Sequence, residues 1–372
     1  MKNINELTVA ANTEKILAVN TNQVIIYNKN IYSYDIAAKK LLWEHKADNG
    51  EYNLSNCQLY GNLLYAMFNH YRSGYADMHD RKLIIIDTQS GSIIWKASVV
   101  SNSSYFYVNH NLVYCLNSSE NKVYCFDTNK SDDNLLWEQK IKIKVDKDFQ
   151  AEYMGRKYKP GILSCFIWDI FLVVTSDANQ WFYINPTTGV IERIVELKHS
   201  LIGKQQMYPI YDRPLVVHDN TATFIYRGVL CRVNLDSGET NAYITSYNGK
   251  KQNEMTSKDN FWGNYDRDVF LADNKFYFDN DSTIAQAFFE IPVNSIDGII
   301  TRKVEFNEKL VSLNTNRVKV FGNYLYINRN GITRYNLETG ETTQIEGNNF
   351  NDFTVVDNLL FIVTDNSVLI YE

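Results

Sequence analysis

Residues of the types that dominate protein–protein interfaces gather in three stretches of this sequence. Tyr, Trp and Arg supply most of the binding energy at such interfaces, and the three stretches carry several Tyr and Arg and one Trp. We therefore predict a protein-binding site built from these stretches. The alternative is that the aromatic rings only hold long loops against the rest of the fold. The predicted site residues are Tyr71, Arg72, Tyr75 and His79 in stretch 69–81; Tyr153, Arg156 and Tyr158 in stretch 144–161; and Phe261, Trp262, Tyr265 and Arg267 in stretch 246–267.

The first stretch also contains residues that could bind a metal ion or move a proton. His70 and His79 flank Asp77 and Asp80 there, and imidazole and carboxylate groups serve both purposes. Their spacing, however, matches no standard metal or catalytic motif. We expect a solvated loop without a metal.

A second group of residues coincides in part with a calcium-binding loop. Asp279, Asp281, Thr283 and Glu290 have the spacing of four of its ligand positions. Such a loop needs Gly at its sixth position, where this chain has Ile284. The apolar runs 276–278 and 288–291 on either side are typical of strands rather than helices. The segment is therefore predicted to be a β-hairpin with no bound metal.

Motifs of the common enzyme classes are missing from the sequence. There is no phosphate-binding glycine-rich loop, no His-Glu-x-x-His helix and no Gly-x-Ser-x-Gly turn. We predict no cofactor and favour a protein without catalytic activity.

The elements that position these residues follow from an internal repeat. An apolar run that ends in Asp or Asn is followed by a short polar turn and a second run, which in the first three units carries Trp43, Trp95 or Trp137. The ends of the first run lie at positions 35, 87, 127, 185, 234, 292, 336 and 372, on average about 48 residues apart. This period is typical of β-propeller blades, and the 14% content of aromatic residues favours strands.

A two-residue turn precedes each of these positions except the first. From Asn220, Asn323 and Asn358 the spacing to the next position is 14, 13 and 14 residues, which is room for two short strands and a turn. Most of the turn residues tolerate the positive φ that tight hairpins require. Each unit therefore contains four antiparallel strands, A to D. The predicted turns are Gly61-Asn62, His110-Asn111, Trp168-Asp169, Asp219-Asn220, Asp273-Asn274, Gly322-Asn323 and Asp357-Asn358.

The last unit contains only three strands, because the chain ends at Glu372. The missing strand would leave an open sheet edge, and the apolar stretch Glu6 to Ala10 can fill it by pairing beside Val368 to Tyr371. We predict an all-β chain, 1–372, that forms one eight-bladed β-propeller closed by its two ends. Seven blades is the alternative if the unit around Pro292 is misinterpreted.

The turn followed by Trp resembles the repeat of the PQQ-like propellers, the quinoprotein alcohol dehydrogenase-like superfamily. Asp87 to Trp95 is the best copy, while later units carry Arg193 or Tyr243 near the place of the Trp. The resemblance implies an eight-bladed ring. For the quinone-dependent members it also implies a calcium-bound cofactor and often a disulfide between adjacent cysteines. This chain has no two adjacent cysteines. We therefore take the resemblance as evidence of architecture and not of quinone chemistry.

The repeat also predicts which face of the ring is functional. A-to-B and C-to-D turns lie on one rim of a four-stranded blade, while B-to-C loops and D-to-A crossovers lie on the other. The excess length falls in 69–81, 144–161 and 246–267, all of which belong to the second rim. Because insertions on a rigid scaffold commonly carry function, we place the partner site on this face.

Charge and cysteine content limit the class of partner and the compartment. The formal net charge is -6, which disfavours nucleic acid and favours a basic partner. No apolar run reaches the length of a membrane helix, and residues 1–15 contain no apolar segment typical of a signal peptide. The five cysteines are scattered without Cys-x-x-Cys spacing, so neither a disulfide framework nor a zinc site is expected. We predict a cytoplasmic monomer with reduced thiols.

These observations favour a non-catalytic, protein-binding propeller. An immunity-type protein that neutralises a basic toxin and a scaffold for an assembly both fit the same residues. The alternative is an enzyme that acts on a glycan or another polar small molecule in the central funnel. Two or more carboxylates or histidines that converge in the funnel would favour the enzyme.

Overall fold

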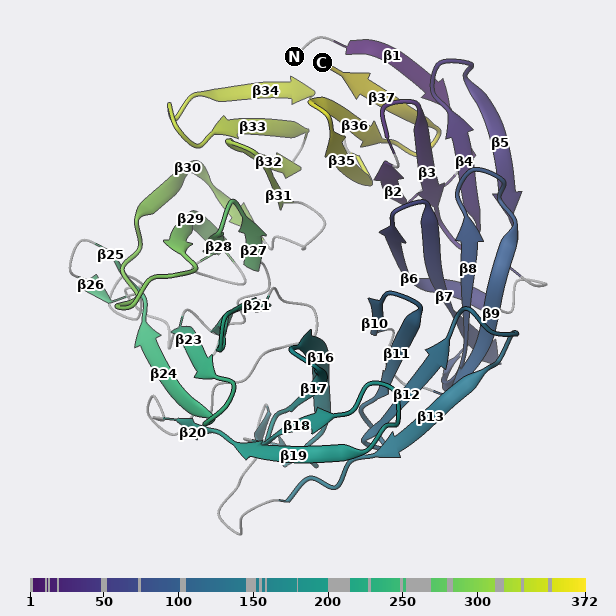
Figure 1. Cartoon of the computed structure of the whole chain (residues 1–372). Helices are drawn as coiled ribbons and strands as arrows, with labels where there is room; N and C mark the ends of the chain where they lie inside the picture. Colours follow the sequence, from purple (N-terminus) through teal and green to yellow (C-terminus); the bar gives the residue numbers. More distant parts are fainter. Residues whose placement is uncertain are drawn as a thin grey trace.

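The structure is a computed structural model, and it is all-β in the part of the chain that it describes (Figure 1). Because these residues form no helix, none of them belongs to a helix that could cross a membrane. The described residues are 3–10, 12, 14–18, 20–47, 52–72, 75–100, 105–144, 152–153, 156–157, 159–178, 180–199, 215–226, 229–247, 250–251, 269–279, 284–311, 318–328, 331–346 and 350–372.

Eight antiparallel sheets of four strands surround a common centre, so the chain is an eight-bladed β-propeller (Figure 1). The first four blades are β2 (Lys15–Ala18), β3 (Gln23–Tyr27), β4 (Ile31–Asp35) and β5 (Lys40–His45); β6 (Tyr52–Tyr60), β7 (Leu63–Arg72), β8 (Tyr75–Asp87) and β9 (Ile93–Val100); β10 (Phe106–Asn109), β11 (Leu112–Asn117), β12 (Lys122–Asp127) and β13 (Leu135–Lys140); and β16 (Ile162–Trp168), β17 (Phe171–Ser176), β18 (Gln180–Ile184) and β19 (Ile191–Glu196).

The other four blades complete the ring. They are β21 (Leu215–His218), β22 (Thr221–Tyr226), β23 (Val229–Asn234) and β24 (Glu239–Ile244); β27 (Val269–Ala272), β28 (Lys275–Asp279), β29 (Ile284–Pro292) and β30 (Arg302–Val311); β31 (Val318–Phe321), β32 (Tyr324–Asn328), β33 (Ile332–Asn336) and β34 (Thr342–Glu346); and β35 (Asp352–Val356), β36 (Leu359–Val363) and β37 (Ser367–Tyr371) with β1 (Asn3–Thr8). Short additional strands are β14 (Glu152–Tyr153), β15 (Arg156–Lys157), β20 (Lys198–His199), β25 (Ser246–Tyr247) and β26 (Lys250–Lys251).

The two ends of the chain close the ring by sharing the eighth blade, as predicted. β1 pairs antiparallel with β37, with Leu7 opposite Val368 and Glu6 opposite Leu369. The strand begins at Asn3 and ends at Thr8, earlier than the predicted Glu6 to Ala10. The blade that contains Pro292 is complete, from β27 to β30. The eight-bladed prediction is therefore confirmed, and the seven-bladed alternative is wrong.

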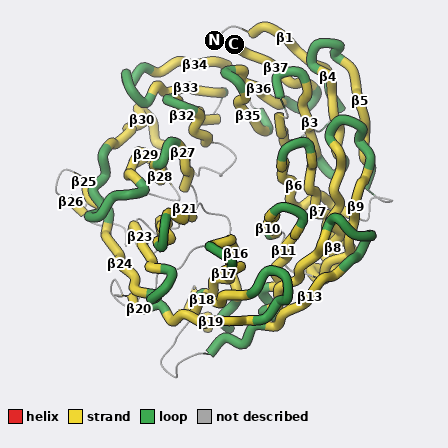
Figure 2. The backbone as a smooth tube through the Cα atoms, viewed as in Figure 1, coloured by secondary structure: helices red, strands yellow, loops and turns green. Residues whose placement is uncertain are grey.

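The short turns have the backbone conformation that their residues predicted. Gly61, His110 and Asp357 have φ angles of 57°, 53° and 48°. The turn after β16 differs by one residue from the prediction, because Trp168 still belongs to the strand and Asp169, with φ of 51°, begins the turn. Asp adopts positive φ far more readily than a bulky residue does. Figure 2 shows how short most of the loops between neighbouring strands are.

The three tryptophans of the repeat are buried between neighbouring blades. Trp43, Trp95 and Trp137 are only 9%, 1% and 8% exposed, and each packs in a cluster that draws residues from its own blade and the next. The indole of Trp43 covers Gly91 in the turn of the second blade, where a Cβ atom would overlap the ring. Gly91 also has a φ of 73°, so this position requires glycine for two independent reasons.

Later blades replace the tryptophan with polar residues, and the strand register identifies them. Arg193 lies opposite Tyr183, at the same place in its blade as Trp95 opposite Ile85. In the fifth blade this place belongs to Asn241 rather than to Tyr243. Tyr243 lies two residues further along β24, where it packs against Gly298 of the sixth blade.

Candidate functional site

The structure places the first predicted stretch on a β-hairpin and not on a loop. β7 continues to Arg72 and β8 begins at Tyr75, so these two residues lie directly opposite each other. Tyr71 belongs to β7, and His79 lies on β8. The expectation of an irregular loop from 69 to 81 is therefore wrong, because the two central strands of this blade extend beyond the others. The two strands of this hairpin hold four of the predicted site residues.

Part of the second stretch is also a hairpin, and the rest of the predicted site lies outside the described residues. Tyr153 on β14 pairs with Arg156 on β15. The short hairpin of β25 and β26 lies within the third stretch. Tyr158, Phe261, Trp262, Tyr265 and Arg267 are outside the described part of the chain, so a joint site for all three stretches stays a prediction.

The three hairpins lie in the kinds of connection that were predicted for the second rim. The hairpin of β7 and β8 joins strands B and C of its blade, while the other two lie in crossovers from strand D of one blade to strand A of the next. The third hairpin, however, begins beside the C-to-D connection of the sixth blade, where Ser246 bonds to Gly298 and Ile300. A common face for all three hairpins therefore stays a prediction.

Among the described residues, no group of three His, Cys, Asp or Glu side chains is arranged to hold a metal ion. Asp279 ends β28 and Glu290 lies on β29, which pair as the predicted hairpin. The buried Glu290 carboxylate accepts hydrogen bonds from Thr301 Oγ1 at 2.9 Å and Tyr277 OH at 3.1 Å. Lys275 Nζ lies 3.2 Å from the same carboxylate. Glu290 therefore belongs to a network of polar side chains within its own blade.

The five cysteines are buried, and none forms a disulfide in this structure. Cys115 and Cys125 lie on paired strands but are offset, because Cys115 faces Tyr124 and Cys125 faces Tyr114. Burial raises the pKa of the Cys115 thiol to about 12. Since the thiolate is the nucleophilic form, a buried neutral thiol of this kind is suited to packing rather than to catalysis.

The described residues of the eight inner strands include one buried carboxylate, and it lies where the ring closes. Asp352 on β35 is the only carboxylate that the described residues of the eight innermost strands carry. Lys319 Nζ lies 3.2 Å from Asp352 Oδ1, and the Ile16 amide donates to Oδ2 at 3.2 Å. Asp352 thereby links the seventh, eighth and first blades. Burial lowers the pKa of nearby Lys15, against the opposing effect of Asp352. This arrangement strengthens the ring closure.

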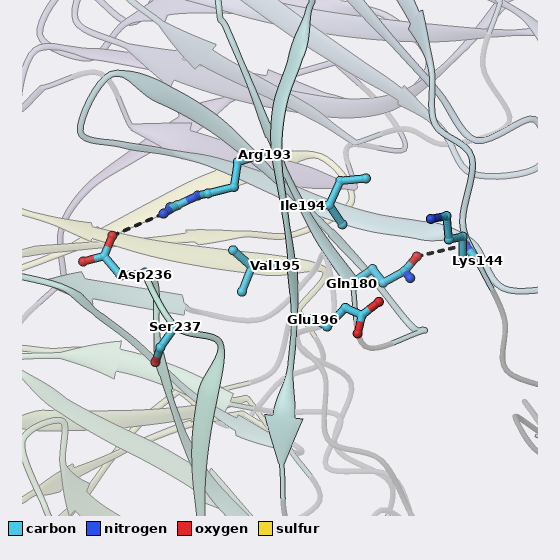
Figure 3. A pocket seen from close by; sticks show the side chains of 8 residues that line it. All are labelled: Lys144, Gln180, Arg193, Ile194, Val195, Glu196, Asp236 and Ser237. Atoms are coloured by element: carbon cyan, nitrogen blue, oxygen red, sulfur yellow. Dashed lines mark hydrogen bonds and ion pairs between the residues drawn. The ribbon is translucent and has the colours of Figure 1, made fainter.

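The sequence did not predict a groove of about 400 Å³ on the outside of the ring, between the fourth and fifth blades. On one wall Arg193 lies 3.4 Å from Asp236, and on the other the Lys144 amide donates to Gln180 Oε1 at 2.9 Å (Figure 3). The groove is lined by Lys144, Gln180, Arg193, Ile194, Val195, Glu196, Asp236 and Ser237.

Arg193 connects the fourth blade to the fifth at this groove, as a tryptophan connects neighbouring blades earlier in the ring. Its guanidinium lies 4.1 Å above the ring of Tyr183, a favourable cation–π distance. It also donates to the carbonyl oxygen of Leu235 in the next blade at 3.3 Å. The sequence feature that pointed to this groove was Arg193, which stands where the first three units of the repeat carry Trp.

Comparisons with known proteins support the architecture. The sequence matches no known protein family, and it matches no curated protein. Its fold is similar to that of the computationally designed Ika8 protein, with a TM-score of 0.61 at 11% identity over 100% of this chain and 99% of that one. BamB from Moraxella catarrhalis has a TM-score of 0.58 at 13% identity, and Sqt1 from Saccharomyces cerevisiae has 0.59 at 12%, each again over 100% of this chain and 99% of the other. At these identities the similarity establishes the propeller fold alone.

Proposed function

We propose that this chain is a non-catalytic protein-binding propeller whose partner docks on the face that carries the three long stretches. The observation that supports this most directly is the asymmetry of the ring. Hairpins extend one B-to-C connection and two D-to-A crossovers, whereas the A-to-B turns stay tight. A rigid ring with elaborations on one face is suited to presenting a binding surface.

The narrower form of the proposal is an immunity-type inhibitor that neutralises a basic toxin. A net charge of -6 favours a basic partner by steering the encounter. An assembly scaffold would use the same surface. The proposal places the chain in the cytoplasm as a monomer, where its five buried thiols would stay reduced. It also includes a distant relationship to the PQQ-like repeat, supported by the turn from Asp87 to Trp95 and by the eight-bladed ring.

The experiment is affinity purification of the full chain from its native host, followed by mass spectrometry. A variant that combines Arg72→Ala, Tyr158→Ala and Trp262→Ala should lose the captured partner. A control with Gln89→Ala and Glu338→Ala, on the opposite rim, should retain it. Capture that is equal for both variants would contradict the proposed face.

Growth measurements separate the two forms of the proposal. If the captured partner is toxic when expressed alone, co-expression of this chain should restore growth, and the triple variant should not. A captured protein without toxicity would favour the scaffold instead. Turnover of a glycan or another small molecule by the purified chain would contradict the non-catalytic assignment.

A further inference from the structure

We propose that the turn rim of the fourth blade is a second docking surface, which binds a segment of a partner protein that carries a basic side chain next to an apolar one. The turn rim is the rim with the A-to-B and C-to-D turns, opposite to the face proposed above. The second docking surface is therefore independent of that face. A comparison of the eight blades with one another identifies it.

The residue directly before strand B is asparagine in every blade except the fourth, which has Ile170 there. In six of the other blades, the backbone carbonyl of this asparagine accepts a hydrogen bond from an amide of the C-to-D connection, at 2.7 to 2.9 Å. This bond joins the two turns of a blade. The asparagines at this position are Asn22, Asn62, Asn111, Asn220, Asn274, Asn323 and Asn358.

The fourth blade lacks both parts of this connection between its turns. The amide that would donate belongs to Pro186, and proline has no N–H. No described residue donates a hydrogen bond to the Ile170 carbonyl. The side chain differs as well, because the amide of Asn111 donates to Asp127 Oδ1 at 2.7 Å in the third blade, which isoleucine cannot do. The fourth blade therefore presents an apolar side chain and a carbonyl where other blades have a closed polar turn.

Apolar side chains gather around this turn. Ile170 is 67% exposed. Trp168 and Phe171 lie opposite each other on its two sides, and their half-buried rings stack with centroids 6.4 Å apart. Val190, at the end of the C-to-D turn of the same blade, is 56% exposed and takes the place of Ser92 in the second blade. Exposed apolar patches mark interaction sites, and tryptophan is frequent among interface hot spots.

Two carboxylates lie beside the apolar side chains. Asp169 belongs to the same turn as Ile170, and it has no ion-pair partner among the described residues. Asp219 begins the A-to-B turn of the fifth blade, and its carbonyl accepts a 3.1 Å hydrogen bond from Trp168 Nε1. The Asp219 side chain is 87% exposed and lies 3.0 Å from His218. Since β16 and β21 are neighbouring inner strands (Figure 1), the two turns form one continuous surface.

The chemistry of this surface indicates its occupant. Its free polar groups are acceptors, namely the Asp169 and Asp219 carboxylates and the Ile170 carbonyl. Arg193 does not offset their charge, because its guanidinium lies 3.4 Å from Asp236. A Lys or Arg side chain supplies donors and positive charge, and an apolar neighbour can cover Ile170. A second copy of this chain, with a net charge of -6, fits less well, so the occupant is a basic segment of another protein.

The test selects phage-displayed random heptapeptides on the full chain, and measures the affinities of labelled synthetic copies by fluorescence anisotropy. Selected peptides should carry Lys or Arg next to an apolar residue. Ile170→Asn installs the residue of the other seven blades, so the ring should stay folded while affinity falls about tenfold or more. Asp169→Asn should weaken binding a few-fold and reduce its dependence on salt. The matched control Asn323→Ala, at the same position of the seventh blade, should bind as the wild type does.

Two further measurements separate this surface from the face proposed above. The variant that combines Arg72→Ala, Tyr158→Ala and Trp262→Ala should bind the peptides like the wild type. Bound peptide should slow hydrogen exchange in 168–171 and leave 60–63, the equivalent turn of the second blade, unchanged. Equal affinity for the wild type and Ile170→Asn, selected peptides without basic residues, or failure to select any peptide would overturn the proposal. A dimer of this chain that Ile170→Asn dissociates would assign the surface to a second copy and would also overturn it.

Discussion

Trp43 Nε1, on the outermost strand of the first blade, donates a 2.8 Å hydrogen bond to the carbonyl oxygen of Thr88 in the second blade. Trp137 makes the same contact with Pro186 of its next blade at 2.9 Å. Arg193 makes it with Leu235 at 3.3 Å. One interaction between neighbouring blades therefore persists although the side chain that provides it changes from an indole to a guanidinium.

The most deeply buried of the three tryptophans should contribute strongly to stability. Truncation by Trp95→Ala removes a ring that is 1% exposed and leaves a cavity between two blades, so we expect a loss of about 3 to 5 kcal/mol in the free energy of unfolding. Urea denaturation followed by circular dichroism measures this loss. A variant as stable as the wild type would show that the ring is not held together through this cluster.

The hydrogen bond of Trp137 should be separable from the packing of its ring. Trp137→Phe removes the donor to Pro186, whereas Trp95 Nε1 is buried without a partner among the described residues. Both changes to Phe lose similar volume, but only the first removes a hydrogen bond. The Pro186 carbonyl then keeps only the long contact from Cys125 Sγ at 3.9 Å, and the lost hydrogen bond costs about 0.5 to 1.5 kcal/mol. We therefore expect Trp137→Phe to be the more destabilising by about that amount in denaturant titrations. Equal losses would mean that the hydrogen bond contributes nothing measurable.

Position 91 should require glycine for two reasons: its positive φ, and the close approach of the Trp43 ring, which leaves no room for a side chain. Gly91→Ala places a methyl group inside the ring of Trp43, whereas Gly61→Ala, also at positive φ, meets no atom within 4 Å. We expect Gly61→Ala to cost about 1 kcal/mol through backbone strain. Gly91→Ala should cost more, because the Trp43 ring must also move. Comparison of the two melting temperatures checks this order, which a larger effect at Gly61 would refute.

The Glu290 network should make stability depend on acid pH. Burial alone would raise the pKa of this carboxyl, but hydrogen bonds from Thr301 and Lys275 outweigh it and lower the pKa below its ordinary value. Glu290 therefore stabilises the fold above the ordinary carboxyl pKa of about 4.3, and this contribution is lost as the pH falls through the folded-state pKa.

The measurement for Glu290 is the free energy of unfolding between pH 6 and 3, a range set by that pKa. Glu290→Gln should be about 1 to 3 kcal/mol less stable at pH 6, with a smaller further loss on acidification than the wild type. The exposed Glu338→Gln is the control and should follow the wild-type curve. Parallel pH curves for wild type and Glu290→Gln would contradict the assignment.

The predicted partner face should carry the binding energy once a partner is known. Arg72→Ala, Tyr158→Ala and Trp262→Ala are each expected to weaken binding by about 1 to 4 kcal/mol, as interface hot spots do, without unfolding the ring. Gln89→Ala and Glu338→Ala on the opposite rim should be nearly silent. Calorimetric titration of both sets decides the matter. Equal losses on the two rims would show that the lengths of the stretches do not indicate the working face.

Much of the fold was predictable because it depends on residues that are close together in the chain. The turns at Gly61, Asp219 and Asp357 need positive φ, and Gly, Asp and Asn mark such turns by type alone. Their regular spacing then determined the number of blades, and the incomplete last unit indicated that the two ends of the chain must meet.

Other features appeared only in the tertiary structure, because they depend on contacts between blades and on the backbone. The role of Arg193 in place of tryptophan follows from its register opposite Tyr183, which no single-strand pattern reveals. The extended hairpin that ends at Arg72 and Tyr75 depends on pairing across two strands. The close approach of Gly238 to the Glu196 carbonyl joins the fourth and fifth blades. Side-chain patterns determine the faces of strands, whereas only the assembled ring decides which residues of neighbouring blades meet.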